Sequence, residues 1–207
     1  FPILSSLILL PSIGALFLFF TKSNKENNIT VKYVALFTSL VNFFLSIYLW
    51  ILFDQTTSEF QFIEDRIWIE DLINYKVGID GISILFIILT TFITPLCIIS
   101  VNNSIKNRLR EFLIAILIME SFMIGVFCSL DLVVFYLFFE AGLIPMFLII
   151  GIWGGARRVY SAFKFFLFTL LGSVLMLIAI ISIYWITGTT DVIQLYELGI
   201  EAKYQNL

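Results

Sequence analysis

The sequence predicts an all-α polytopic membrane protein with six transmembrane helices, and three observations lead to this prediction. Hydrophobic residues make up 60% of the 207 residues and charged residues only 13%, about half of the roughly 25% that is usual in soluble domains. Apolar runs long enough to cross a bilayer recur along the chain. The charges between these runs alternate in sign from loop to loop. A water-soluble domain could not bury so much apolar surface, so we expect lipid to surround most of the chain.

The six expected spans form a single membrane domain over residues 1–207. Each run can cross the hydrocarbon core as a helix that rises about 1.5 Å per residue. The first run is not a signal peptide, because Lys22 and Lys25 follow it instead of preceding it. Only Leu130 and Asp131 separate the fourth and fifth runs, which predicts a tight helical hairpin. The spans lie near residues 2–21, 31–53, 82–101, 112–130, 132–150 and 161–186.

Basic residues predict the orientation of these spans. Of the 12 lysines and arginines, eight lie in the first, third and fifth loops, three lie in the other loops or the tail, and Lys164 falls in or beside the sixth span. Basic loops stay on the cytoplasmic or matrix side of a membrane. We therefore expect the N-terminus to face the periplasm or the intermembrane space. Residues 54–81, which are rich in Asp and Glu, are interpreted as a solvated surface loop on that same side.

Two glutamates lie near the middle of neighbouring spans, Glu120 in the fourth and Glu140 in the fifth. An ionised side chain at this depth costs from about 2.5 to more than 10 kcal/mol, so it is seldom kept without a function. Glu140 is the first candidate for a proton-carrying group. Glu120 is a secondary candidate, because no kink or polar neighbour accompanies it in the sequence. For both, the alternative is a neutral, hydrogen-bonded carboxyl group that only holds helices together.

Residues near Glu140 predict a polar notch that shapes a channel in the fifth span. Pro145 cannot donate a hydrogen bond to the carbonyl of Ala141, and Gly142 leaves space beside that carbonyl. Such a break is tolerated against protein or water but not against lipid. Lys164 is a further candidate for shaping the channel, although a side chain that reaches to the membrane surface explains it equally well.

The sequence has no pattern typical of a metal or cofactor site. It contains no histidine, and Cys97 and Cys128 stand far apart inside apolar runs. It also lacks a Gly-rich phosphate loop and a nucleophile motif. We expect no metal, no cofactor and no redox centre in this chain. The net charge of -3 suggests no nucleic-acid partner.

Four segments carry a resemblance to a known family: Val77–Ser83, Phe135–Met146, Gly151–Gly154 and Phe165–Ser173. Together they resemble chain 4, or subunit M, of proton-pumping NADH-quinone oxidoreductase, respiratory complex I. The segment from Glu140 to Pro145 is shared with other antiporter-like subunits, so alone it indicates only the superfamily. Its combination with residues 78–83 and 169–173 points to chain 4.

The resemblance implies the first part of an antiporter-like bundle of fourteen helices with inverted repeats. In that family the glutamate matched by Glu140 pairs with a lysine on a broken seventh helix. This chain stops before such a helix, so we expect it to be a fragment of a longer product. The resemblance also implies that NADH, FMN, iron–sulfur clusters and quinone bind to partner subunits. Neighbouring antiporter-like subunits and the lipid bilayer would be its partners, in an energy-transducing inner membrane of a bacterium or a mitochondrion.

The function expected from these features is proton translocation coupled to quinone reduction, in which Glu140 changes its ionisation inside a half-channel. Two alternatives remain open. The chain could be a subunit of a multisubunit cation/proton antiporter or of a membrane-bound hydrogenase, which share the antiporter-like fold. It could also be a passive membrane scaffold in which Glu120 and Glu140 only fix helix packing.

Overall fold

The computed structural model describes residues 2–21, 28–69, 73–101, 105 and 107–198, and within them six helices are long and apolar enough to span a membrane. The prediction of six spans is therefore confirmed. A short helix, α7 (Val192–Leu198), follows the last span. The spanning helices are α1 (Ile3–Phe20), α2 (Asn28–Leu52), α3 (Ser83–Ser100), α4 (Leu109–Cys128), α5 (Leu132–Trp153) and α6 (Arg158–Thr187).

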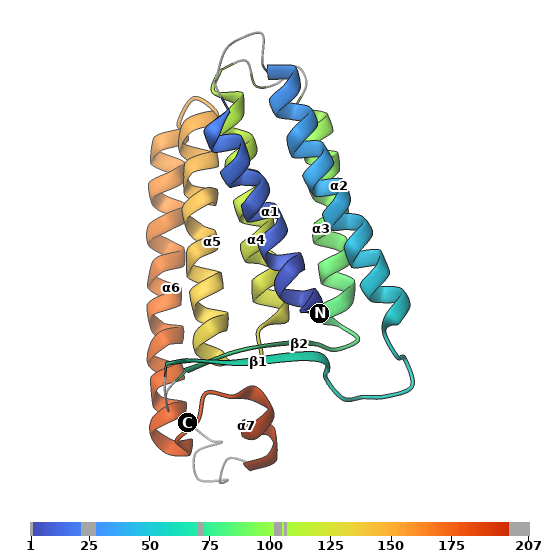
Figure 1. Cartoon of the computed structure of the whole chain (residues 1–207). Coiled ribbons are helices and arrows are strands. Elements are labelled where there is room, and N and C mark those ends of the chain that lie inside the picture. Colours follow the sequence, from blue (N-terminus) through green and yellow to red (C-terminus); the bar gives the residue numbers. More distant parts are fainter. Residues whose placement is uncertain (1, 22–27, 70–72, 102–104, 106, 199–207) are drawn as a thin grey trace.

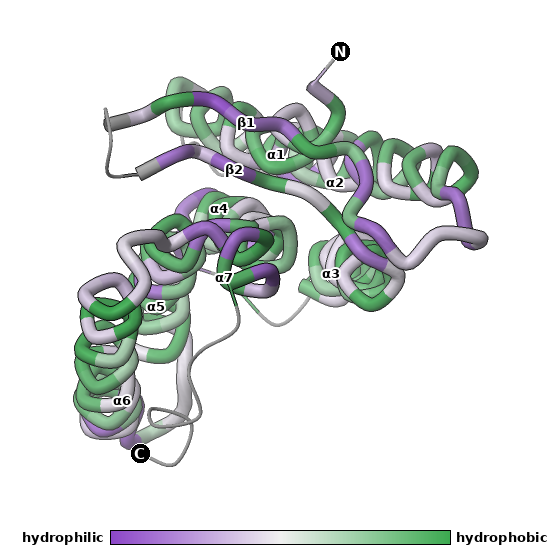
Figure 2. The backbone as a smooth tube through the Cα atoms, turned by 90° about the horizontal axis from the view of Figure 1, so that it is seen from below, coloured by the Kyte–Doolittle hydropathy of each residue, from purple (hydrophilic) through white to green (hydrophobic). Residues whose placement is uncertain are grey.

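Helices α1 to α4 form a bundle, and α5 and α6 extend from it in a row (Figure 2). Within the bundle α1 packs on α2 and α4, and α3 packs on α2 and α4. Outside it, α5 packs on α4, and α6 packs on α5. The buried share of the span falls from 50% in α4 to 17% in α5 and 11% in α6. Most residues of α6 are exposed and most of those of α5 are half-buried, so α6 above all offers surface to lipid or to further protein.

The expectation that residues 54–81 form a solvated loop is wrong, because an antiparallel β-hairpin occupies most of this segment. Its strands, β1 (Gln61–Ile69) and β2 (Ile73–Ile79), lie across the ends of the helices (Figure 1). Val77 and Ile79 of β2 are fully buried against the bundle. In β2 apolar side chains alternate with polar or small ones from Ile73 to Ile79. This period of two is the sequence signal of a half-buried strand.

One acidic residue of the hairpin is an integral part of the bundle. Glu64 of β1 accepts hydrogen bonds from the backbone N–H of Leu4, at 2.9 Å, and from the N–H and hydroxyl of Ser5. These N–H groups lie at the start of α1, where a helix has no internal acceptors and carries partial positive charge. The Ser5 hydroxyl also lies 3.2 Å from the Tyr75 hydroxyl. Burial raises the pKa of Tyr75 above 10.0, although the hydrogen bond with Ser5 opposes this shift.

The buried residues of the four-helix bundle are arranged in three layers. An apolar cluster at the hairpin end includes Leu4, Leu49, Ile87 and Ile124. A second apolar cluster at the opposite end includes Leu18, Val31, Ile98, Leu113 and Leu117. Along α2, α3 and α4, buried polar residues lie in sequence between the two clusters: Ser39, Asn42, Ser46, Thr91, Thr94, Glu120 and Ser121. The middle layer of the bundle is therefore polar, at the depth where a membrane is most apolar.

Candidate functional site

Glu120 lies in the polar middle layer and is 2% exposed. Its Oε1 accepts a hydrogen bond of 2.9 Å from Nδ2 of Asn42, which is fully buried on α2. The sequence suggested no polar neighbour for Glu120, and this expectation is wrong because its partner stands 78 positions away along the chain. Asn42 drew no attention in the sequence because a single Asn in an apolar run has no distinctive pattern. The packing of α2 against α4 brings the two groups together.

Hydroxyl groups around this pair form hydrogen bonds within and between the helices of the bundle. Ser121 donates to the carbonyl of Ile8 on α1, and Ser12 donates to the Ser121 hydroxyl at 2.8 Å. Ser46 bonds to the carbonyl of Phe43 and lies 2.7 Å from the Thr91 hydroxyl. These contacts tie α1 to α4 and α2 to α3 within the polar layer. Interhelical hydrogen bonds of this kind favour helix association in a membrane.

Glu140 lies on α5, outside the four-helix bundle, and its side chain is partly buried. Its Oε2 is shielded from solvent and has no hydrogen-bond partner among the described residues. A buried carboxylate oxygen without a partner is unfavourable in an apolar environment. Unlike Glu120, Glu140 has no polar residue of the described chain bonded to it. A complementary group from outside these residues would remove the deficit.

Pro145 and Gly142 lie within one uninterrupted helix. Pro145 is buried, and α5 continues through it to Trp153. Since proline has no N–H, the Ala141 carbonyl lacks its usual helical donor. A Cβ added at Gly142 would lie 3.8 Å from Cβ of Phe122 on α4, which is an ordinary contact. The space expected beside Gly142 is therefore present, but packing against α4 does not require a glycine there.

Lys164 is exposed on α6. Among the described residues, neither Glu120 nor Glu140 forms an ion pair with it. The structure thus brings Glu120 together with Asn42 and leaves Glu140 and Lys164 as separate groups.

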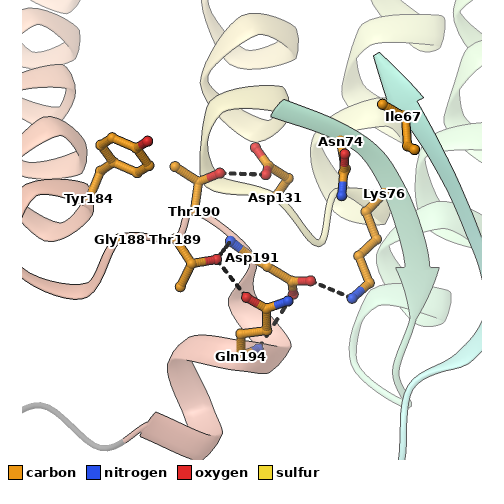
Figure 3. Close-up of a pocket in the computed structure, with 10 residues that line it drawn as sticks. All are labelled: Ile67, Asn74, Lys76, Asp131, Tyr184, Gly188, Thr189, Thr190, Asp191 and Gln194. Atoms are coloured by element: carbon orange, nitrogen blue, oxygen red, sulfur yellow. Dashed lines mark hydrogen bonds and ion pairs between the residues drawn. The ribbon is translucent and has the colours of Figure 1, made fainter. Parts of the chain in front are cut away.

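A polar pocket of about 400 Å³ lies at the hairpin end of the molecule, where β2, the α4–α5 turn and the α6–α7 connection meet (Figure 3). Lys76 Nζ lies 2.5 Å from Asp191 Oδ2, and both side chains are nearly buried. Asp131 accepts hydrogen bonds from the N–H groups of Val133 and Val134, which caps α5, and from the Thr190 hydroxyl at 2.6 Å. Each acidic group here already has a partner. The residues that line the pocket therefore connect β2, the α4–α5 turn and the α6–α7 connection, a role that sequence analysis did not anticipate.

Comparisons with known proteins agree with this architecture. The family described as NADH:quinone oxidoreductase/Mrp antiporter, TM, matches residues 129–207. NADH-quinone oxidoreductase subunit M of Rhodobacter capsulatus is 58% identical over 79% of this chain and 32% of its own length. NADH-ubiquinone oxidoreductase chain 4 of Marchantia polymorpha is 48% identical over 91% of this chain and 38% of its own length. The chain thus spans about a third of the length of these relatives.

A solved structure shares the fold as well. A chain of respiratory complex I from Thermus thermophilus with bound NADH superposes with a TM-score of 0.76 and 27% identity. The match covers 91% of this chain and 38% of that chain. The sequence relatives, the matched family and this structure all agree with the resemblance seen in the sequence motifs. The chain belongs to the antiporter-like membrane subunits of NADH-quinone oxidoreductase, among the proteins named subunit M or chain 4.

Proposed function

We propose that this chain is part of a proton-translocating membrane subunit of NADH:quinone oxidoreductase, and that Glu140 is the carboxylate through which quinone reduction is coupled to proton movement. The observation that carries the proposal is the buried Glu140 Oε2, which has no partner among the described residues. A mid-membrane carboxylate whose oxygen has no hydrogen-bond or ion-pair partner is unfavourable unless another group supplies one. A carboxylate that acquires and loses a cationic partner can take up and release a proton.

The energies involved are adequate for this role. An ammonium group about 4 Å from a carboxylate, at an effective dielectric constant near 20, contributes roughly 4 kcal/mol. Moving one charge across a membrane works against about 2.3 kcal/mol per 100 mV. Forming and breaking one ion pair at Glu140 is therefore sufficient to shift a proton against a respiratory potential. We propose that the ammonium is the seventh-helix lysine that the family resemblance implies.

The remaining parts of the machinery belong to other subunits in this proposal. We propose that NADH, FMN, iron–sulfur clusters and quinone bind to partner chains, and that neighbouring antiporter-like subunits contact this one. The location proposed is an energy-transducing inner membrane. The proposal of neighbouring subunits is supported by the exposed apolar side chains of α5 and α6, which offer room for further helices.

The test is Glu140→Gln in the full-length protein within the assembled complex. Glutamine keeps the size of the side chain but cannot ionise, so we expect loss of proton pumping and of coupled quinone reduction while assembly persists. Glu120→Gln is expected to have a milder effect. The matched control is Glu111→Gln, because Glu111 is also on α4 but is exposed at its end. Full turnover with an intact proton gradient in Glu140→Gln would refute the proposal.

A second candidate, a subunit of a cation/proton antiporter, is favoured by the matched family, whose description names both classes. The two functions differ in their dependence on electron transfer. A respiratory subunit moves protons only when quinone is reduced, whereas an antiporter exchanges cations for protons without it. Cation-driven proton movement in vesicles that contain no quinone, abolished by Glu140→Gln, would favour the antiporter.

A further inference from the structure

At Glu120, unlike at Glu140, the residue bonded to the carboxyl group also has a buried oxygen without a hydrogen-bond partner. Nδ2 of Asn42 donates to Glu120 Oε1 at 2.9 Å. The other oxygen of each group, Asn42 Oδ1 and Glu120 Oε2, is buried and has no hydrogen-bond partner among the described residues. Both atoms are acceptors if Glu120 is ionised. Two unpaired acceptors thus belong to two side chains that already touch.

No donor among the neighbouring hydroxyl groups is left to satisfy these oxygens. One turn away on α2, Ser39 donates to the carbonyl of Leu36, and Ser46 bonds to the carbonyl of Phe43. Ser121, next to Glu120, donates to the carbonyl of Ile8. Within the described ranges the ion pairs are Lys76–Asp191 and Arg110–Glu111, so none involves Glu120. An ionised Glu120 would therefore be a buried charge supported by one amide hydrogen bond.

A single proton on Glu120 Oε2 removes both deficits. The protonated carboxyl group has one donor and one acceptor, as does the side of a carboxamide that faces it. The Oε2–H can donate to Asn42 Oδ1 while Asn42 Nδ2 donates to Oε1, so that two antiparallel hydrogen bonds close a planar ring. We propose that Glu120 and Asn42 form a neutral carboxyl–carboxamide pair that holds one proton in the middle of the bundle and joins α4 to α2.

This site has a different role from the one proposed for Glu140. The pair is enclosed between the two apolar clusters of the α1–α4 bundle. The proton on Glu120 Oε2 supplies the hydrogen-bond donor that Asn42 Oδ1 otherwise lacks. Glu120 is thus a positioning residue whose bound proton sets the spacing of α2 and α4. Its assignment does not depend on whether Glu140 carries protons.

The protonation state can be read by infrared spectroscopy on the complex that contains the full-length protein at neutral pH. The difference spectrum between the wild type and Glu120→Gln is expected to show loss of the carbonyl stretch of a protonated carboxylic acid. Glu111→Gln is the control, since Glu111 is exposed beside Arg110 and should lose carboxylate bands instead. Loss of carboxylate bands in Glu120→Gln would overturn the proposal and indicate an ionised, water-bridged group.

Thermal unfolding provides a second, independent test. Glutamine at position 120 reproduces the pattern of the protonated acid, with one donor towards Asn42 Oδ1 and one acceptor for Nδ2. We expect Glu120→Gln to unfold at the wild-type temperature and Glu120→Leu to unfold at a clearly lower one. Asn42→Leu combined with Glu120→Leu should recover part of the loss, because no polar group is then left unpaired. Equal destabilisation by Gln and Leu at position 120 would refute a neutral pair.

Discussion

Asp80 illustrates how a single acidic side chain is used at the junction of the hairpin and α3. Its Oδ1 accepts a hydrogen bond of 2.7 Å from the backbone N–H of Ser83 at the start of the helix. Burial raises the pKa of Asp80, but hydrogen bonds from Ser83 and from the backbone of Asp80 and Ile82 together outweigh burial and leave the pKa below its usual value of 3.8. Like Glu64, this residue was counted with a solvated acidic loop. Both carboxylates satisfy helix N–H groups that have no internal acceptor.

The lowered pKa of Asp80 makes its contribution dependent on pH. Because the folded state favours the ionised form, this stabilisation is present above the unfolded pKa of 3.8 and is lost as pH falls through the folded value. We expect Asp80→Asn to lower the unfolding temperature at neutral pH and to have a smaller effect at an acid pH below the folded pKa, where the carboxyl group is protonated in both states. Thermal unfolding of the full-length protein over this range is the measurement, with exposed Glu59→Gln as the control. An equal deficit at both pH values would contradict this account.

The α4–α5 hairpin illustrates packing between whole helices. A Cβ added at Gly125 of α4 would lie 2.6 Å from the ring of Phe138 on α5, closer than atoms can approach. Small residues that allow helices to approach closely are typical of membrane bundles, in which lipid gives no hydrophobic drive for association. Among the described helices α5 packs mainly on α4 and α6, so this contact is central to its position.

Gly125→Ala is therefore expected to destabilise the hairpin by about 1–3 kcal/mol through overpacking. Gly142→Ala is the matched control, because it makes the same change on the facing helix, where the added Cβ would lie 3.8 Å from Cβ of Phe122, an ordinary contact distance. Equilibrium unfolding of the full-length protein in mixed micelles compares the two. Phe138→Leu should partly restore the stability of Gly125→Ala, and equal effects at Gly125 and Gly142 would refute a steric cause.

Across the whole molecule, three distant segments meet at the hairpin end. The N–H of Leu130 donates to the Lys76 carbonyl at 2.9 Å, and that of Leu132 donates to the Thr190 carbonyl at 3.0 Å. The Lys76–Asp191 ion pair lies beside these backbone bonds (Figure 3). Because α6 packs mainly on α5 and not on the four-helix bundle, this junction helps to fix the ends of α5 and α6 relative to the bundle. It also holds the start of the helix that carries Glu140.

Removing one member of the Lys76–Asp191 pair is expected to loosen this junction. Lys76→Met leaves the nearly buried Asp191 carboxylate without its cation and should cost roughly 3 kcal/mol. Asp191→Asn added to Lys76→Met removes that charge, so the double variant should be more stable than Lys76→Met alone. Unfolding of the four proteins of this double-mutant cycle, in the full-length chain, gives the coupling energy. Strictly additive effects would show that the pair contributes nothing.

Much of the candidate site could be located from the sequence, but its partners could not. Glu120 and Glu140 were found because a carboxylate in an apolar run is conspicuous at any depth. The same local pattern could not reveal that Asn42 completes Glu120 or that Glu64 caps α1, because these partners are 78 and 60 positions apart. The hairpin was missed although the alternation in β2 was present, since the acidic composition of the segment favoured a solvated loop.

The number of membrane helices, their approximate bounds and the alternation of loop charge follow from the sequence alone. The reason is that hydrocarbon thickness and backbone hydrogen bonding act on each segment separately, so a local apolar run is sufficient to specify a span. Which carboxylate receives an internal partner, which remains incomplete, and where the hairpin lies depend on packing between segments far apart in the chain. These contacts exist only once the helices assemble, and for that reason the three-dimensional structure was needed to show that Glu120 has a partner among the described residues and that Glu140 has none.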